Sequence, residues 1–450
     1  MHPLPVLPSG RLEQRFSESK PPYTAAEAVT EANRCIYCVD APCIKACPTG
    51  IDIPNFIHKI GTGNTTGAAR TILKENILGA SCARVCPVEV LCAGACVYNA
   101  WGREPIAIGR LQRFATETTL NERPLSSVVA AKKPPTGKRV AIVGAGPASI
   151  AAAGLLVLEG HQAVLFEKKA VPGGLNTLGI APYKQSALQA LKEIEWVFSL
   201  GDIELKSGVE IVAGAAGAGQ VAVASLLTDY DAVFLGLGLG PDSALGADGE
   251  AGAGVYGAVE LIERIKADPG ASVAGVKRAL VIGGGNTALD IAHELKLLGI
   301  DDVAMVYRRG QKDMSGYEHE LAHARESGVR LVEHRAVTTF HRDAAGALTG
   351  VTLARTENGK PVSGGEEQLA CELVALAIGQ ATATEVVTAL PGVQLDKKGR
   401  VVVDPATHRT GNDKVWSGGD CVNGGKEVVN AVQEAKIAVR DICARLAGSK

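Results

Sequence analysis

Residues 139–169 read RVAIVGAGPASIAAAGLLVLEGHQAVLFEKK. The apolar run at the start predicts a buried strand, the glycines after it predict a tight turn, and the Ala- and Leu-rich segment predicts a helix that leads into a second strand. Residues 277–310, KRALVIGGGNTALDIAHELKLLGIDDVAMVYRRG, repeat this order of elements. Two strand–turn–helix–strand units in one chain predict an α/β fold with two Rossmann-like nucleotide-binding domains.

Each unit carries a glycine-rich turn of the kind that binds a dinucleotide. In the first unit, glycines that allow a pyrophosphate to approach the backbone open the helix, and Ser149 occupies the third position of the motif. The strand that follows ends in Glu167, whose carboxylate suits a free ribose 2′-hydroxyl. The expected binding residues of this turn are Gly144, Gly146, Pro147, Ala148, Ser149 and Glu167.

In the second unit, the strand after the helix ends in basic residues instead of an acid. Guanidinium groups there suit a 2′-phosphate, which predicts NADPH. If YRRGQK is only a solvated basic loop, NADH remains possible. The expected binding residues are Gly283, Gly284, Gly285, Asn286, Thr287, Arg308, Arg309 and Lys312.

Bulk properties narrow the class of protein. A chain of 450 residues is long enough for about three domains. The net charge of −2 predicts no electrostatic attraction to nucleic acid or to an anionic membrane surface. The start of the chain lacks the apolar core of a signal peptide, and no apolar run approaches a membrane span, so we expect a cytoplasmic protein. Disulfides are rare in that compartment, and the 11 cysteines need another explanation.

Eight of these cysteines lie between residues 35 and 96. The stretch RCIYCVDAPCIKACPTG, residues 34–50, has the spacing C-x2-C-x4-C-x3-C-P. Bacterial ferredoxins use a related run in which three thiolates hold one cubane cluster and the fourth ligates another. By that logic Cys35, Cys38 and Cys43 hold one [4Fe-4S] cluster and Cys47 reaches a second. Two four-thiolate zinc sites would also absorb eight cysteines, but zinc usually takes paired C-x2–4-C knuckles, and a disulfide framework is disfavoured by the compartment.

The spacing alone does not assign the remaining ligands. The segments CIYCVDAPCIKACPTGIDIPNFI, GASCARVCPVEVLCAGAC and PIAIGRLQRFATE resemble the N-terminal half of dihydropyrimidine dehydrogenase and the flavin-bearing subunit of its bacterial two-subunit form. The small subunit of glutamate synthase is related to both. The resemblance continues through GAGPASI, FEK and GGL to GGD near residue 420, and so spans nearly all of the chain.

This resemblance implies the full set of cluster ligands. One cluster would take Cys35, Cys38, Cys43 and Cys96, and the other would take Cys47, Cys86, Cys92 and the amide of Gln112, with Cys82 left as a non-ligand. The residues alone say less: Gln112 shares an apolar helical face with Ile108, so its buried amide binds either metal or backbone. The glutamate synthase branch carries Glu at this position, and Gln112 therefore favours the pyrimidine branch.

The resemblance also assigns the first dinucleotide site to FAD. Residues 416–436, WSGGDCVNGGKEVVNAVQEAK, resemble the second flavin motif of pyridine nucleotide-disulphide reductases. In that motif Asp420 would bind the ribityl chain, and a helix that starts near Glu427 would point its N-terminus at the isoalloxazine ring. Lys184 stands where the family carries an arginine. The further expected flavin contacts are Val85, Gly174, Leu175, Lys184, Gly419 and Asp420.

The second dinucleotide unit lies between two flavin segments, so its domain is expected to be an insertion. We expect a helical domain with two [4Fe-4S] clusters at 1–136, an FAD-binding domain at 137–275 and 396–450, and an NAD(P)H-binding domain at 276–395. The first 22 residues, rich in Pro and polar groups, are expected to wrap around the protein or to remain loose.

The resemblance implies an electron-input subunit. A hydride would pass from C4 of NADPH to N5 of FAD, and single electrons would pass through the clusters to an FMN- and iron–sulfur-containing partner that reduces uracil or thymine. No catalytic side chain is nominated, because the hydride step needs no protein acid or base. The alternatives are a glutamate synthase small subunit, an NAD(P)H:ferredoxin transhydrogenase subunit and, from another class, a non-catalytic zinc-containing redox sensor.

Overall fold

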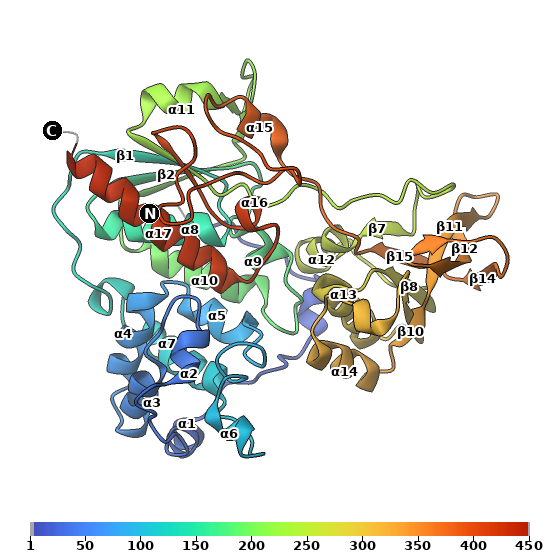
Figure 1. Ribbon diagram of the computed structural model, residues 1–450, viewed down its shortest axis with the longest axis horizontal. Coiled ribbons are helices and arrows are strands. Elements are labelled where there is room, and N and C mark those ends of the chain that lie inside the picture. The colour runs from blue at the N-terminus through green and yellow to red at the C-terminus, as the bar shows by residue number, and fades with distance from the viewer. Residues whose placement is uncertain (1–3, 449–450) are drawn as a thin grey trace.

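The computed structural model describes residues 4–448, which form three domains (Figure 1). The first is the helical domain that the cysteine-rich sequence predicts. Its first helix, α1, starts with the capping box that Thr24 and Glu27 predict, with both reciprocal bonds formed. The helices of this domain are α1 (Ala25–Ala32), α2 (Pro42–Ala46), α3 (Ile53–Gly61), α4 (Thr65–Glu75), α5 (Gly79–Val85), α6 (Val97–Ala100) and α7 (Ile108–Glu122).

The second domain is built on a parallel five-stranded sheet in the order β16-β6-β1-β2-β3. The first strand, turn, helix and second strand fall where the opening motif predicts them. The strands are β1 (Arg139–Val143), β2 (Gln162–Glu167), β3 (Ile203–Ser207), β6 (Ala232–Leu235) and β16 (Val415–Ser417); the helices are α8 (Pro147–Leu158), α9 (Gly174–Leu178), α10 (Ala187–Phe198), α11 (Val223–Asp229), α15 (Thr384–Thr388), α16 (Asp420–Asn423) and α17 (Val428–Gly448). A small parallel pair, β4 (Glu210–Val212) and β5 (Gln220–Ala222), lies beside this sheet.

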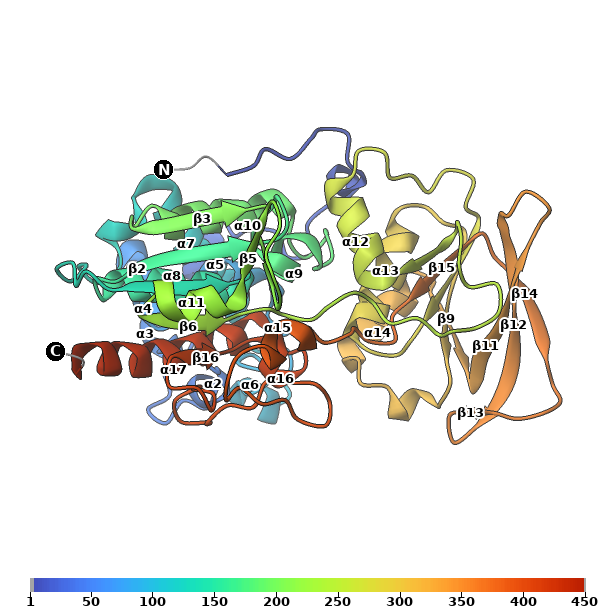
Figure 2. The same ribbon diagram turned by 90° about the horizontal axis from the view of Figure 1, so that it is seen from above.

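The third domain, on the right of Figure 1, has a second parallel sheet in the order β10-β9-β8-β15-β7. Its elements are β7 (Val255–Gly257), α12 (Ala258–Ala267), β8 (Arg278–Ile282), α13 (Asn286–Leu297), β9 (Asp302–Tyr307), α14 (Glu318–Glu326), β10 (Arg330–Glu333) and β15 (Leu373–Leu376). An antiparallel unit of β11 (Arg335–Arg342), β12 (Leu348–Glu357), β13 (Lys360–Pro361) and β14 (Glu367–Ala370) flanks it at the outer end (Figure 2).

The limits of the third domain differ from the expected 276–395. Strand β7 pairs with β15 in the second sheet, so this sheet takes in a strand and a helix, β7 and α12, that lie before residue 276. Conversely, α15 and the residues after it pack with Leu390 in the core of the second domain. The chain crosses between the two domains twice, and the crossings pair with each other, Gly240 donating to Ala381 and Ala381 to Pro241.

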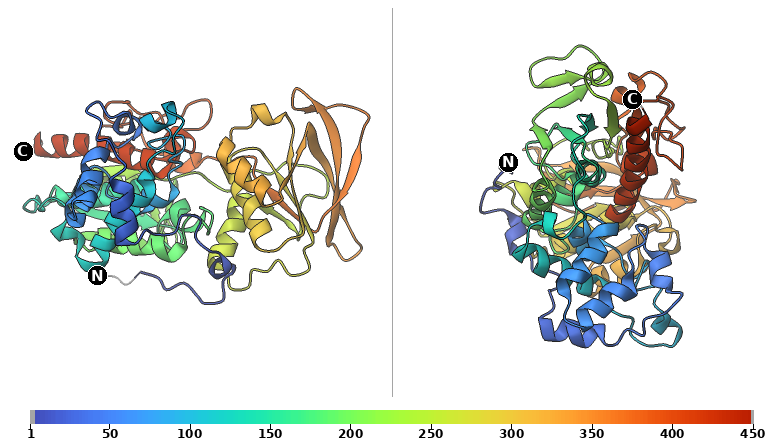
Figure 3. Two further views of the ribbon diagram at one scale, coloured as in Figure 1. Left: turned by 90° about the horizontal axis from the view of Figure 1, so that it is seen from below. Right: turned by 90° about the vertical axis from the view of Figure 1, so that its left-hand side faces the viewer.

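The three domains are packed as one body. Helices α4, α5 and α7 of the first domain share a hydrophobic core with α8, α10 and α17 of the second. The N-terminal segment wraps around all three domains: Leu7 packs into that shared core, Phe16 packs against the core of the third domain, and Glu18 forms ion pairs with the first domain (Figure 3). Among residues 4–448 no helix has both the length and the apolar character needed to cross a membrane.

Candidate functional site

A cavity of about 1250 Å³ opens at the carboxyl end of the first sheet, where all three domains meet. Doubly wound sheets bind their ligands at this edge. Most of the expected flavin residues line it, and they come from three separate parts of the chain. The residues expected from sequence that line this cavity are Val85, Gly144, Gly146, Pro147, Ala148, Glu167, Gly174, Leu175, Lys184, Asn286, Thr287, Gly419 and Asp420.

Glycines shape the floor of this cavity. Gly144 has φ of 89°, and a Cβ added there would lie 2.5 Å from the carbonyl oxygen of Gly236. Gly146, which precedes α8, has no atom within 4 Å of such a Cβ, so its backbone faces open space. A bare backbone at the start of a helix is the cradle that a dinucleotide pyrophosphate requires, and the cavity therefore fits the expected cofactor.

Acidic groups stand at two further points of the cavity. Glu167, at the end of β2, accepts hydrogen bonds from the backbone N–H groups of Ala145 and Lys169, each at 2.8 Å. Burial raises the pKa of the Asp420 carboxyl to about 6, and the Glu434 carboxylate acts in the same direction. Both carboxyl groups are fixed in place and available to hydroxyl groups of a ligand.

Ser149 occupies a different place from that expected. Its side chain is fully buried. A Cβ added at Gly236 would lie 2.1 Å from its Oγ, so Ser149 packs closely against the turn after β6. The third position of the motif therefore contributes to packing of the helix against the sheet and does not line the cavity.

Lys184 lines the cavity but has protein partners. Its Nζ lies 2.7 Å from Asp290 of α13 and 2.6 Å from Glu320 of α14. Burial alone would lower the pKa of this ammonium group, but the two carboxylates outweigh burial and raise it. Lys184 therefore joins the second domain to the third domain.

The second dinucleotide motif sits where the fold predicts, in the turn between β8 and α13. Gly283 has φ of 147°, and a Cβ there would lie 2.3 Å from the carbonyl oxygen of Ala377. Arg308, Arg309 and Lys312 follow β9 and are exposed. Of this motif only Asn286 and Thr287 reach the cavity; Gly283, Gly284, Gly285, Arg308, Arg309 and Lys312 lie outside its lining.

The structure brings four cysteines together around a small second cavity of about 30 Å³. These are Cys35, Cys38, Cys43 and Cys96, and isoleucine side chains such as Ile53 and Ile108 complete the lining. Burial, and next the proximity of Cys35, raises the pKa of the Cys43 thiol to about 11. Iron compensates for such crowding because it binds the thiolate form.

The other thiols form a second group nearer the flavin cavity. Burial raises the pKa of Cys92 to about 12, with Cys47 next in effect, and a hydrogen bond with Cys82 is the main cause of the raised pKa of Cys86. Cys82 is buried in the core that the first and second domains share. Val85, directly before Cys86, lines the flavin cavity, so this second group is adjacent to it.

Gln112 is buried on α7, which packs against α5, the helix that carries Cys82. Its Nε2 donates a hydrogen bond of 2.7 Å to the carbonyl oxygen of Gly79. Because a carbonyl can accept only from the NH₂ end of the amide, the oxygen Oε1 is left as the atom that can ligate iron.

Among residues 4–448 no group of three or more His, Cys, Asp or Glu side chains is arranged to hold a single metal ion. The cysteine spacing is related to the runs that hold iron–sulfur clusters in bacterial ferredoxins.

Some residues of the cavity were missed at the level of sequence. Tyr317, at the start of α14, donates a hydrogen bond of 2.8 Å to Glu427 at the start of α17, and both line the cavity. Burial raises the pKa of Tyr317 to about 12, with Glu427 next in effect. No sequence motif marks this tyrosine. Asp290 lies one helical turn after Asn286, and that spacing could have identified it.

A dinucleotide cavity between two Rossmann-like domains, with two groups of thiols behind it, defines an NAD(P)H-dependent iron–sulfur flavoprotein oxidoreductase. Comparison with known families agrees: residues 12–124 match dihydropyrimidine dehydrogenase domain II, 4Fe-4S cluster, and residues 138–435 match pyridine nucleotide-disulphide oxidoreductase. The chain therefore belongs to the pyridine nucleotide-disulphide oxidoreductase family, in the group whose members carry an N-terminal iron–sulfur domain.

Two relatives from Escherichia coli strain K12 match over nearly their whole length. The chain is 33% identical to the NAD-dependent dihydropyrimidine dehydrogenase subunit PreT over 96% of this chain and 98% of that protein. It is 32% identical to the glutamate synthase [NADPH] small chain, over 95% of this chain and 93% of that protein.

Solved structures share the fold of the two nucleotide-binding domains. FprA from Mycobacterium tuberculosis (His57Gln mutant) superposes with a TM-score of 0.56 at 19% identity, over 70% of this chain and 86% of that one. Thioredoxin reductase from T. acidophilum superposes with a TM-score of 0.54 at 20% identity, over 68% and 99%.

Proposed function

We propose that this chain is the electron-input subunit of a dihydropyrimidine dehydrogenase. It would pass electrons from NADPH to an FMN- and iron–sulfur-containing partner that reduces uracil or thymine to the 5,6-dihydro form. The observation that carries this choice is Gln112, a neutral amide whose nitrogen donates to the carbonyl oxygen of Gly79 and whose oxygen would be the atom that ligates iron.

The cofactors proposed for this function are one FAD and two [4Fe-4S] clusters. FAD takes up a hydride from NAD(P)H and releases electrons singly, the form in which iron–sulfur clusters accept them. Cys35, Cys38, Cys43 and Cys96 would hold the outer cluster; Cys47, Cys86, Cys92 and Gln112 would hold the inner one. The closeness of the second group to the flavin cavity supports this order, because Val85 and Cys86 are neighbours in the chain.

The protein's own part is to bind and orient. Helix α17 starts at Val428 on the cavity wall, and a helix N-terminus stabilises negative charge by about 0.3–1 kcal/mol. The Tyr317–Glu427 hydrogen bond and the ion pairs of Lys184 hold the third domain against this wall. These contacts hold the cavity between the two nucleotide-binding domains.

NADPH is the proposed donor, because Arg308, Arg309 and Lys312 present exposed positive charge directly after β9. The relative PreT is named as NAD-dependent. Comparing the KM values for NADPH and NADH therefore decides which nucleotide is the donor. If the basic residues bind a 2′-phosphate, Arg308→Ala raises the KM for NADPH and leaves the KM for NADH unchanged.

A glutamate synthase small chain is the second candidate. The similarity to that protein of Escherichia coli extends over 95% of this chain at nearly the same identity. Its cofactor set and internal chemistry would be the same, and only the partner that receives the electrons would differ.

Activity measurements on the purified chain test the proposal. The isolated chain is expected to oxidise NADPH with an artificial one-electron acceptor and to show no uracil-dependent oxidation; adding the FMN-bearing subunit should produce dihydrouracil. Uracil reduction by the chain alone would contradict the subunit assignment. Coupling instead to a glutamate-forming subunit would establish the second candidate.

A further inference from the structure

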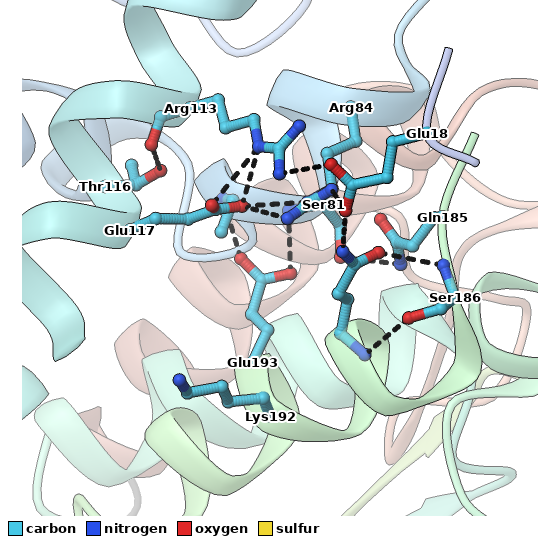
Figure 4. A network of polar contacts seen from close by, with 12 residues as sticks. Glu18, Ser81, Arg84, Arg113, Thr116, Glu117, Gln185, Ser186, Lys192 and Glu193 are labelled. Carbon is cyan, nitrogen blue, oxygen red and sulfur yellow. Dashed lines mark hydrogen bonds and ion pairs between the residues drawn. The ribbon is translucent and has the colours of Figure 1, made fainter. Parts of the chain in front are cut away.

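Helix α5 is held at its first turn by a residue of another domain (Figure 4). Glu193 of α10, only 2% exposed, accepts hydrogen bonds from the backbone N–H groups of Ala80 at 2.8 Å and Ser81 at 3.0 Å. The residue before the helix, Leu78, makes no side-chain capping bond. Glu193 therefore satisfies N–H groups that the helix leaves unpaired, from 112 and 113 residues further along the chain.

The position of α5 matters to both redox sites. Val85, its last residue, lines the flavin cavity, and Cys86 follows directly as an expected ligand of the inner cluster. The carbonyl oxygen of Gly79, in the first turn, is bonded by Gln112, another expected ligand. The short helix therefore connects the expected inner cluster site to the flavin cavity. Its first turn is held by Gln112 of its own domain and by Glu193 of the second domain.

A cluster of further charged groups lies beside this contact. Glu117 of α7 forms ion pairs with Arg84 of α5 at 2.5 Å and with Arg113 at 3.2 Å, and Glu18 of the N-terminal segment pairs with both arginines (Figure 4). The arginines are nearly fully buried. These charges compensate one another, whereas Glu193 has no cation among its partners in the described structure, only Ala80, Ser81 and the nearby Glu117.

We propose that Glu193 is a positioning residue that fixes α5, with Val85 and Cys86, between the flavin cavity and the inner cluster site and thereby sets the rate of electron transfer between them. This inference rests on the proposed function, because it assumes that both cofactors are bound. Electron transfer falls steeply with distance, and small displacements of a reacting group cost large factors in rate. Helix α5 has only seven residues, so we expect release of its first turn to displace Val85 and Cys86 at its other end.

The protonation state of Glu193 bears on this contact. Burial raises the pKa of its carboxyl to about 7 and the Glu117 carboxylate acts in the same direction, while the bonds from Ser81 and Ala80 oppose the shift. Because the buried carboxyl binds its proton more tightly than an exposed one, the contact loses stability as the pH rises through about 7.

The decisive variant is Glu193→Gln, with Glu195→Gln as its matched control. Glu195 lies on the same helix and is exposed. Stopped-flow absorbance would follow flavin reduction by NADPH and cluster reduction separately. We expect Glu193→Gln to leave flavin reduction unchanged and to slow cluster reduction by about tenfold or more, and Glu195→Gln to change neither. Hydrogen exchange of the peptide covering residues 78–86 should be faster only in Glu193→Gln.

Cluster reduction in Glu193→Gln at the wild-type rate would overturn the proposal, and so would an equal slowing of flavin reduction and cluster reduction. If Glu193→Gln does not fold, Glu193→Asp decides: its shorter side chain keeps the charge but withdraws from Ala80 and Ser81, so cluster reduction should be slower and flavin reduction unchanged, and cluster reduction at the wild-type rate would overturn the proposal. Iron and flavin contents are measured first. Absence of either refutes the proposed function itself, and with it this inference, whereas fully loaded protein with an unaffected variant refutes the role of Glu193 alone.

Discussion

At Gly144 the backbone leaves β1 with φ of 89°, and any side chain there would meet the carbonyl oxygen of Gly236 at 2.5 Å. Both facts require glycine: the left-handed conformation costs other residues about 1–2 kcal/mol, and a contact with backbone cannot be relieved by a rotamer change. The glycines of the motif could be predicted from sequence because the turn itself requires them, whatever the rest of the fold.

Gly144→Ala is expected to abolish stable flavin binding, because the turn must shift away from Gly236 and the pyrophosphate cradle shifts with it. Flavin content after purification measures the effect. Gly214→Ala is the control, since a Cβ there has no neighbour within 4 Å. Full flavin occupancy in Gly144→Ala would show that this turn does not carry the cofactor.

The Asp420 carboxyl gives a pH-dependent contribution to stability in flavin-free protein. Burial raises its pKa to about 6, above the value of 3.8 for an exposed aspartate. The folded state therefore binds the proton more tightly, and this contribution to stability is lost as the pH rises from about 4 through 6. Asp420→Asn should raise the stability of flavin-free protein by on the order of 1 kcal/mol at pH 7.5, because it removes this charge.

Thermal unfolding at two pH values measures that prediction. The variant and the wild type should differ in Tm at pH 7.5 and converge near pH 4. Asp301→Asn, at an exposed position, serves as control. An equal Tm difference at both pH values would mean that the effect does not come from the charge of Asp420.

At the scale of elements, bonds between the loop that joins α9 to α10 and helices of the third domain connect the two nucleotide-binding domains. Lys184 binds Asp290 of α13 and Glu320 of α14, and the fully buried Lys266 of α12 donates to the carbonyl oxygens of Ile180 and Gln185, each at 2.8 Å. These bonds fix the angle between the domains and hence the width of the cavity.

Lys184→Met should destabilise the protein by about 3 kcal/mol, because it leaves two close carboxylates without their cation in a site where side chains are only 13–17% exposed. Lys184→Arg should restore most of this loss. The control is Lys133→Met, which removes an exposed pair with Glu159 and should change stability by less than about 1 kcal/mol. Equal Tm losses for Lys184→Met and Lys133→Met would contradict the interdomain role.

The same elements show how far sequence reasoning extends. Strands β1, β2, β8 and β9 were predicted because each is a long apolar run next to a glycine turn. Strand β7 was not, because its three residues carry no pattern; it is a strand only because β15, more than 100 residues later, pairs with it. The partners of Lys184 escaped prediction for the same reason: they are 106 and 136 residues away.

At the scale of the whole molecule, the thiol groups lie in a series that starts at the flavin cavity. The inner group adjoins it through Val85 and Cys86, and the outer group surrounds its own cavity, which the exposed residue Ile36 also lines. The N-terminal segment and the shared core bind the domains into one body, so the distances along this series are held by packing. The cysteine spacing predicted two groups, and the fold brings distant Cys96 to the first of them.

The metal and flavin content of anaerobically purified chain tests the central claim most directly. We predict about eight iron atoms, about eight acid-labile sulfides and about one FAD per chain, with NADPH bleaching both the flavin and the cluster absorbance. Colourless protein without iron, or protein that holds zinc at these thiols, would contradict the assignment of this chain as an electron-input iron–sulfur flavoprotein.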